Sequence, residues 1–256
     1  MKTNKEAMTL ALDDGGSDGL PVVFLHGLAG NKSQWKDQLN HLRSSRRAVA
    51  LDLRGHGQSS VPTDGDYAIA AMAKDVTATL HHLRVGRAVL VGHSAGATVA
   101  IACAGEAAGL VAGLVLVDPA GDQRQVPKSV IKGFLSGLSS GAYQITVERW
   151  WEEILKGARK SNREHILADL RATPQAVVLG WFQAMLEYDP VTPLRQYQGP
   201  VLSVITPINN APFSLHKLMP ALRRVVVSGT SHWPHMDRPG KINRILDDFL
   251  KEVEGN

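Results

Sequence analysis

Continuous apolar runs alternate with segments of helical periodicity along this chain. Runs without polar interruption are typical of strands that are covered on both faces of a parallel sheet. The strands predicted in this way are Met8–Leu12, Pro21–His26, Arg47–Asp52, Ala88–Val91, Leu110–Asp118, Gly199–Ile205 and Leu222–Val227. Helices are predicted at Ser33–Ser44, Tyr67–Leu83, Pro212–Leu218 and Lys241–Val253, with another after Gly96. The alternation predicts an α/β protein, and a turn cluster at Asp13–Gly19 predicts that it begins with a hairpin.

The alternation stops between Pro119 and Pro190, where only helical patterns follow one another. They lie at Lys128–Leu138, Thr146–Ala158, Asn162–Leu170 and Thr173–Leu186. We interpret this stretch as a lid over the carboxyl edge of the sheet, with Trp150, Trp181 and Phe182 as candidates for lining a hydrophobic pocket. An alternative is that these residues form the lid's own small core. Trp150 and Trp151 are neighbours on a helix, so we do not expect both to face one side.

Composition narrows the class of protein. The chain has 256 residues, 44% of them hydrophobic, which is enough to bury a sizeable core in one enzyme domain. Its formal charge is +4, but no basic cluster of the nucleic-acid-binding type is present. The single cysteine, Cys103, excludes an intrachain disulfide and is expected to be an inert core thiol. We find no signal peptide and no run of membrane-spanning length, and expect a soluble, cytoplasmic monomer or homodimer.

The apolar run at 88–91 ends in the sequence Gly92-His93-Ser94-Ala95-Gly96, after which the chain becomes helix-forming. A strand, a sharp turn and a helix in this order are what a nucleophile elbow requires. Its serine has a strained backbone, and its glycines allow the strand and the helix to pack closely. A glycine-rich turn that only happens to contain a serine is the alternative, but the flanking pattern favours Ser94 as a nucleophile.

A loop earlier in the chain supplies an oxyanion site for this nucleophile. The strand at 21–26 ends in the sequence His26-Gly27-Leu28-Ala29-Gly30. Such a loop can direct the backbone N–H of Leu28 toward a developing oxyanion, and the N–H of Ala95 is the second donor. His26 is expected to hold the loop by hydrogen bonding, and we also include it among the candidates for lining the substrate pocket.

A histidine after the last predicted strand is the candidate general base. A loop in this position can reach back over the sheet edge to a serine hydroxyl, which favours His232. His235 is the rival and is interpreted as a residue at the pocket rim. Trp233, between them, is a further candidate for the substrate pocket.

Four segments in this order resemble the landmarks of the α/β-hydrolase superfamily, in its serine esterase and lipase-like branch. They are Phe24–Gly27, Asp52–Ser59, Gly92–Gly96 and Gly229–Pro234. The resemblance implies a mostly parallel sheet of about eight strands with helices on both faces. It further implies a triad in the chain order serine, acid, histidine, and a helical cap inserted after the sixth strand. The core domain is then expected at 1–120 and 190–256, with the cap at 121–189.

The third member of the triad departs from the commonest pattern of that family. The acid usually follows the strand that corresponds to 201–205, but the loop here, 206–211, holds Asn209 and Asn210 and no carboxylate. Some relatives take the acid from the end of the preceding strand, where this chain has Asp118. We therefore favour Asp118, with Asp122 or an amide from Asn209 or Asn210 as alternatives.

Together these residues predict a serine hydrolase that cleaves small to medium hydrophobic carboxylic esters through an acyl-enzyme intermediate. No metal and no organic cofactor is needed for this chemistry. Two alternatives stay open. One is hydrolysis of a carbon–carbon bond in a β-diketone-like substrate, and the other is a small-molecule receptor without catalytic activity on a hydrolase scaffold.

Overall fold

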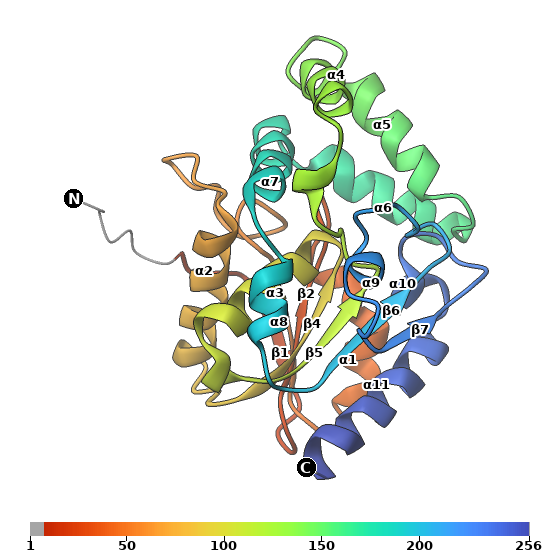
Figure 1. Cartoon of the computed structure of the whole chain (residues 1–256). Coiled ribbons are helices and arrows are strands. Elements are labelled where there is room, and N and C mark those ends of the chain that lie inside the picture. Colours follow the sequence, from red (N-terminus) through yellow and green to blue (C-terminus); the bar gives the residue numbers. More distant parts are fainter. Residues whose placement is uncertain (1–7, 256) are drawn as a thin grey trace.

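The computed structural model describes residues 8–255, and residues 1–7 and 256 of the expected core domain lie outside this range. The described residues contain a seven-stranded sheet in the order β1-β3-β2-β4-β5-β6-β7 (Figure 1). Its strands are β1 (Leu12–Gly15), β2 (Val22–Leu25), β3 (Ala48–Leu51), β4 (Ala88–His93), β5 (Val111–Val117), β6 (Val201–Ile205) and β7 (Arg224–Val226). All neighbouring pairs are parallel except β1 with β3. The mostly parallel α/β architecture is thus confirmed, with seven strands in place of about eight.

The two faces of the sheet are covered by different helices, because successive strand residues point to opposite sides. Val23, Leu25 and Leu90 belong to the apolar cluster shared with α2 (Ile69–His82) and α3 (Ala95–Glu106). Phe24 and Val91 belong to the cluster shared with α1 (Lys36–Leu42) and α11 (Pro239–Gly255). Figure 1 shows these two pairs of helices on opposite sides of the strands. Both faces are therefore buried, as the uninterrupted apolar runs predict.

The beginning of the sheet differs from the prediction in two ways. β1 begins at the last residue of the predicted strand, Leu12, and continues into the predicted turn cluster, and it pairs with β3 rather than forming a hairpin with β2. The reason is tertiary pairing. Asp13 and Asp14 form ion pairs with Arg43 and Arg47, so polar residues serve as an edge strand.

Four helices replace the α/β alternation between β5 and β6. They are α4 (Lys128–Leu138), α5 (Tyr143–Ile154), α6 (Lys160–Ala172) and α7 (Gln175–Glu187). They gather beyond one end of the sheet, at the top of Figure 1. This helical insertion follows the fifth strand in chain order rather than the sixth, because the described sheet has one strand fewer than expected.

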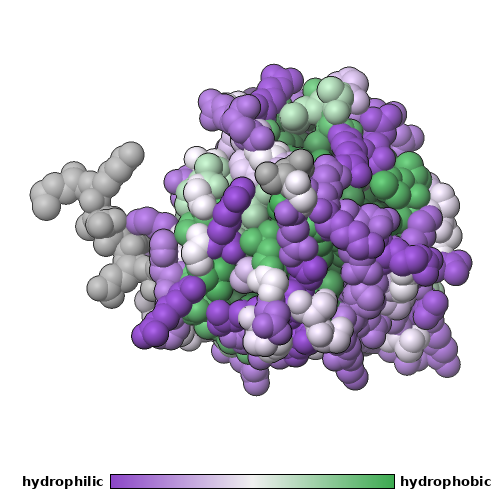
Figure 2. Space-filling model, turned by 90° about the horizontal axis from the view of Figure 1, so that it is seen from below, coloured by the Kyte–Doolittle hydropathy of each residue, from purple (hydrophilic) through white to green (hydrophobic). Residues whose placement is uncertain are grey.

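Short elements complete the fold. They are the 3₁₀ turns η1 (Lys32–Trp35), η2 (Ala108–Leu110) and η3 (Gln123–Gln125), and the helices α8 (Val191–Gln196), α9 (Leu215–Leu218) and α10 (Pro234–Asp237). Polar side chains are spread over much of the face seen from below, with apolar ones between them (Figure 2). Within residues 8–255, none of the helices has the length and apolarity that crossing a membrane requires.

Candidate active site

Ser94 lies at the turn between β4 and α3 in a strained conformation, with φ 51° and ψ −117°. A positive φ costs a residue with a side chain about 1–3 kcal/mol, so the surroundings must hold it. The Ser94 N–H donates to the Val117 carbonyl at 2.9 Å. A Cβ added to Gly92 would lie 2.4 Å from the Gly96 oxygen, and one added to Gly96 would lie 2.3 Å from the His26 oxygen. Close packing of strand and helix therefore requires glycine at both positions.

His232 lies in the loop that follows β7. Its Nδ1 is 2.6 Å from Oδ2 of Asp118, and its backbone N–H donates to the Ile154 carbonyl at 3.0 Å. A carboxylate accepts hydrogen bonds, so Nδ1 carries the proton and Nε2 is left as a base. Ser94 and His232 line the same cavity.

Asp118 comes directly after β5 and is fully buried, with φ 44°. A buried carboxylate is stable only when donors surround it. The Thr206 N–H donates to Oδ1 at 2.7 Å and the Thr206 hydroxyl to Oδ2 at 2.9 Å, beside the bond from His232. Sequence reasoning missed Thr206. The signal was available, because β5 and β6 are parallel neighbours and their ends lie side by side.

The alternative third members are bonded elsewhere. Asp122 accepts from Arg124 and Gln125, and although burial opposes it, these bonds hold the pKa of Asp122 below its usual range. The Asn209 amide donates to the Pro119 carbonyl at 2.9 Å, and its oxygen accepts from the Ser214 hydroxyl at 2.7 Å. Asn210 is exposed. The structure thus brings Asp118, and not these residues, to the His232 ring.

The loop after β2 lies against the nucleophile. A Cβ on Gly27 would be 3.1 Å from Cβ of Ser94, and Gly27 and Leu28 both line the cavity. The Ala29 N–H donates to Nε2 of His56 at 3.0 Å, which helps to hold Ala29 at φ 55°. Ala95 is the first residue of α3, so its N–H has no acceptor within the helix. The two proposed oxyanion donors therefore lie near Ser94. The Ala95 N–H is in the next residue, and the Leu28 N–H belongs to the loop that packs against Ser94.

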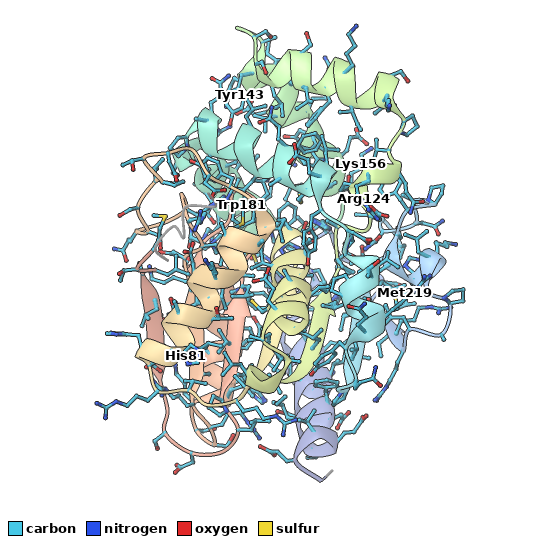
Figure 3. The ribbon with its side chains drawn as sticks, turned by 60° about the vertical axis from the view of Figure 1, so that its left-hand side comes forward. His81, Arg124, Tyr143, Lys156, Trp181 and Met219 are labelled. Atoms are coloured by element: carbon cyan, nitrogen blue, oxygen red, sulfur yellow. The ribbon has the colours of Figure 1, made fainter. Side chains whose placement is uncertain are left out.

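Two of the predicted pocket residues lie outside the cavity. His26 is fully buried; its Nδ1 is bonded to the Gly27 carbonyl at 2.7 Å, and its Nε2 accepts from Leu53 N–H at 2.9 Å. Burial lowers the pKa of His26 to about 4, which keeps the ring neutral. Trp181 is also fully buried, at the junction of α7 with the elements beneath it (Figure 3), and donates to the Arg54 carbonyl at 3.2 Å. Both side chains are thus bonded to the backbone that follows β3, at Leu53 and Arg54, and neither lines the cavity.

The cavity has a volume of about 240 Å³. Trp150, Phe182 and Trp233 line it, as the sequence analysis expects of pocket residues. Trp151 lines it as well, contrary to the expectation that neighbouring tryptophans face different sides. The Trp151 ring contacts the Trp150 ring edge to face, with the ring centroids 4.8 Å apart. The wall also contains further apolar residues, two from the helical insertion and three from the segment after β6, and only the latter come from a part of the chain that the sequence does not link to the pocket. These residues are Ile154, Met185, Ile208, Ala211 and Phe213.

His235, the rival base, is fully buried and does not line the cavity. Its ring stacks on Trp35 with centroids 4.1 Å apart, and within residues 8–255 neither ring nitrogen has a hydrogen-bond partner. Burial lowers the pKa of His235 to about 3. Among residues 8–255, no group of three or more His, Cys, Asp or Glu side chains is placed to hold a metal ion.

The chain belongs to the alpha/beta hydrolase family, which it matches over residues 22–245. It is 30% identical to the sn-1-specific diacylglycerol lipase ABHD11 of Xenopus laevis, over 94% of this chain and 83% of that protein.

Two further similarities differ in their extent. A dihydrolipoyllysine-residue acetyltransferase component of the acetoin cleaving system of Pseudomonas putida is 36% identical, but over 50% of this chain and only 34% of that protein. The structure of a thermophilic esterase from Thermogutta terrifontis superposes with a TM-score of 0.77 at 26% identity, covering 95% of this chain and 93% of the esterase. The match to the family therefore extends along nearly the whole chain, in line with the resemblance in the sequence.

Proposed function

We propose that this protein is a serine hydrolase of small to medium hydrophobic carboxylic esters, acting through an acyl-enzyme. The observation that carries the proposal is the 2.6 Å contact between His232 and Asp118 at a cavity that also exposes the strained Ser94. The similarity to an esterase and a diacylglycerol lipase supports a carboxylic ester as the substrate class.

In the proposed mechanism, Nε2 of His232 accepts the Ser94 proton as the hydroxyl oxygen attacks the ester carbonyl. The backbone N–H groups of Leu28 and Ala95 stabilise the negative oxygen of the tetrahedral intermediate. His232 then donates its proton to the leaving alcohol, and Asp118 stabilises the imidazolium. Water, deprotonated by His232, then attacks the acyl carbonyl. The bond between that carbon and Ser94 Oγ breaks, the carboxylic acid leaves, and His232 returns the proton to Ser94.

We propose that residues 121–189 act as a cap over a core domain formed by the rest of the chain. Trp150 and Phe182 of the helical insertion line the cavity together with Ser94, so this segment covers the reacting group. The cavity of about 240 Å³ lies just below the range of about 300–1,000 Å³ that holds drug-sized ligands. Its size and its apolar wall favour small to medium hydrophobic esters.

The test is hydrolysis of p-nitrophenyl acetate and butyrate, together with labelling by a fluorophosphonate probe. Wild-type protein is expected to release p-nitrophenol and to be labelled on Ser94. Ser94→Ala is expected to abolish labelling and to lower turnover by about 10⁴-fold or more, because the nucleophile is lost. Absence of both labelling and turnover in the wild type would contradict the proposal and leave a small-molecule receptor as the better reading.

A further inference from the structure

The residue before the nucleophile contacts the loop that carries the base. His93 is the last residue of β4, and its Nε2 lies 2.7 Å from the backbone carbonyl oxygen of His232. A carbonyl only accepts hydrogen bonds, so Nε2 of His93 carries the proton and donates it. The strand that presents Ser94 is therefore bonded directly to the backbone of His232.

The surroundings of His93 fix this tautomer. The ring is buried, and burial, followed by the neighbouring His232 and His235, holds the pKa of His93 well below its usual value. A neutral ring has one N–H, which Nε2 uses, so Nδ1 has only a lone pair. Within the described residues Nδ1 has no partner, and it lies 2.8 Å from where a Cβ on Gly27 would be. The ring is thus wedged between the Gly27 loop and the His232 loop.

Among residues 8–255, three hydrogen bonds hold His232, and each leads to a different element. Its side chain reaches Asp118 after β5, and its backbone N–H reaches Ile154 at the end of α5. Of the three, only the bond from His93 leads to the strand that carries Ser94. The bond from His93 therefore sets the spacing between His232 and Ser94. The bond to Asp118 sets the direction of the His232 ring, and the bond to Ile154 sets the contact of its loop with the helical insertion.

We propose that His93 is a positioning residue, which holds the His232 imidazole at the distance that proton transfer from Ser94 requires. The proposal rests on the proposed function, because it gives His93 a catalytic effect only if His232 is the base. An error of about 1 Å in the position of a reacting group costs about 100-fold in rate. Loss of this bond is therefore expected to lower kcat with little effect on KM, since His93 adds little to substrate binding.

Three variants separate positioning from packing. His93→Phe keeps a buried ring but has no donor, whereas His93→Gln keeps an amide N–H at a similar reach. His235→Phe is the matched control, because its ring lies 4.7 Å from that of His93 and its nitrogens bond to nothing in the described part of the chain. We expect His93→Phe to lower kcat on p-nitrophenyl butyrate about 10- to 100-fold with KM within about threefold, and His93→Gln to recover most of it.

Hydrogen exchange provides a readout that does not depend on activity. The amides of residues 229–233 are expected to exchange faster in His93→Phe than in wild type, and to be unchanged in His235→Phe. If the two phenylalanine variants lose kcat equally, or if exchange and kcat stay at wild-type values in His93→Phe, the proposal is wrong. If the wild type neither hydrolyses esters nor reacts with fluorophosphonate, the proposed function fails and with it the catalytic effect. The exchange data then still decide whether His93 holds the loop.

Discussion

Asp118 combines a buried charge with a strained backbone at the end of β5. Its carboxylate faces one imidazole and two donors from Thr206. We expect Asp118→Asn to lower kcat about 10⁴-fold on p-nitrophenyl butyrate, since an amide cannot stabilise the imidazolium and selects the wrong tautomer of His232. Steady-state kinetics on the variant, with a thermal melt to show that it folds, check this expectation.

Asn209→Ala and Asn210→Ala are the controls for that measurement. Neither side chain is bonded to His232. Asn210 is exposed, so Asn210→Ala should retain activity within about threefold. Asn209 lines the cavity and is bonded to Pro119 and Ser214, so Asn209→Ala should lose more activity than that, but far less than Asp118→Asn. Equal and small effects in all three variants would remove Asp118 from the triad.

At the scale of single residues, the sequence predicts side chains whose role depends on local chain geometry. Ser94 follows from its strand, turn and helix, and His232 from its place after the last strand. The predicted loop-holding hydrogen bond of His26 is present, but neither His26 nor Trp181 lines the pocket, because each also bonds to a partner far along the chain, at Leu53 and Arg54. Thr206 also has its partner, Asp118, far along the chain, but the parallel pairing of β5 and β6 is enough to relate the two positions.

At the scale of elements, α10 connects the base loop to the helical insertion through Asp237. One carboxylate oxygen accepts from the Ser231 N–H at 2.9 Å and hydroxyl at 2.6 Å. The other accepts from the Arg159 N–H at 3.2 Å and the Asn162 amide at 2.9 Å. The start of α6 and the segment before His232 are thus both hydrogen-bonded to the same buried carboxylate.

Asp237→Asn is expected to lower the free energy of unfolding by about 2–4 kcal/mol. An amide presents two N–H donors where four donors already converge, so at least one buried bond is lost. Urea denaturation measures the effect. Asp248→Asn, at an exposed position of α11, is the control and should change stability by no more than about 0.5 kcal/mol. A loss in Asp237→Asn as small as in the control would show that Asp237 does not hold the two segments together.

The elements that the sequence predicts well are those whose pattern depends on burial alone. Strands β2 to β5 are covered on both faces, and their apolar runs show it directly. β1 fails because its pairing with β3 and its ion pairs are tertiary, and neither leaves an alternating pattern in four residues. The division into core and cap is still a proposal, although the helical patterns at 128–186 correspond to α4 through α7.

At the scale of the whole molecule, four buried histidines make stability depend on pH. Burial lowers the pKa of His26 to about 4 and that of His235 to about 3, and holds those of His56 and His93 well below the usual value. Each has a folded pKa below the unfolded value of about 6.5, so the unfolded chain binds more protons in this window. Stability is therefore full above pH 6.5 and is lost as the pH falls from about 6.5 toward 3.

The contribution of one such histidine can be measured by difference. A pKa unit corresponds to about 1.4 kcal/mol, so His26 alone costs about 3 kcal/mol once the pH is below 4. In His235→Phe one of the four titrations is gone. Its free energy of unfolding, from urea denaturation between pH 7.5 and 4.5, should fall less steeply with acid than that of the wild type. Parallel curves would show that His235 is not held neutral.

The position of Asp118 also affects how the enzyme can diversify. In the proposed mechanism the acid, Asp118, precedes the helical insertion, so the loop after Thr206 carries no part of the proposed proton relay. That loop nevertheless supplies Ile208, Ala211 and Phe213 to the cavity wall. Selection or engineering can therefore exchange these residues to admit other substrates while Ser94 and the His232–Asp118 contact stay intact, which makes the loop a natural target for a saturation library.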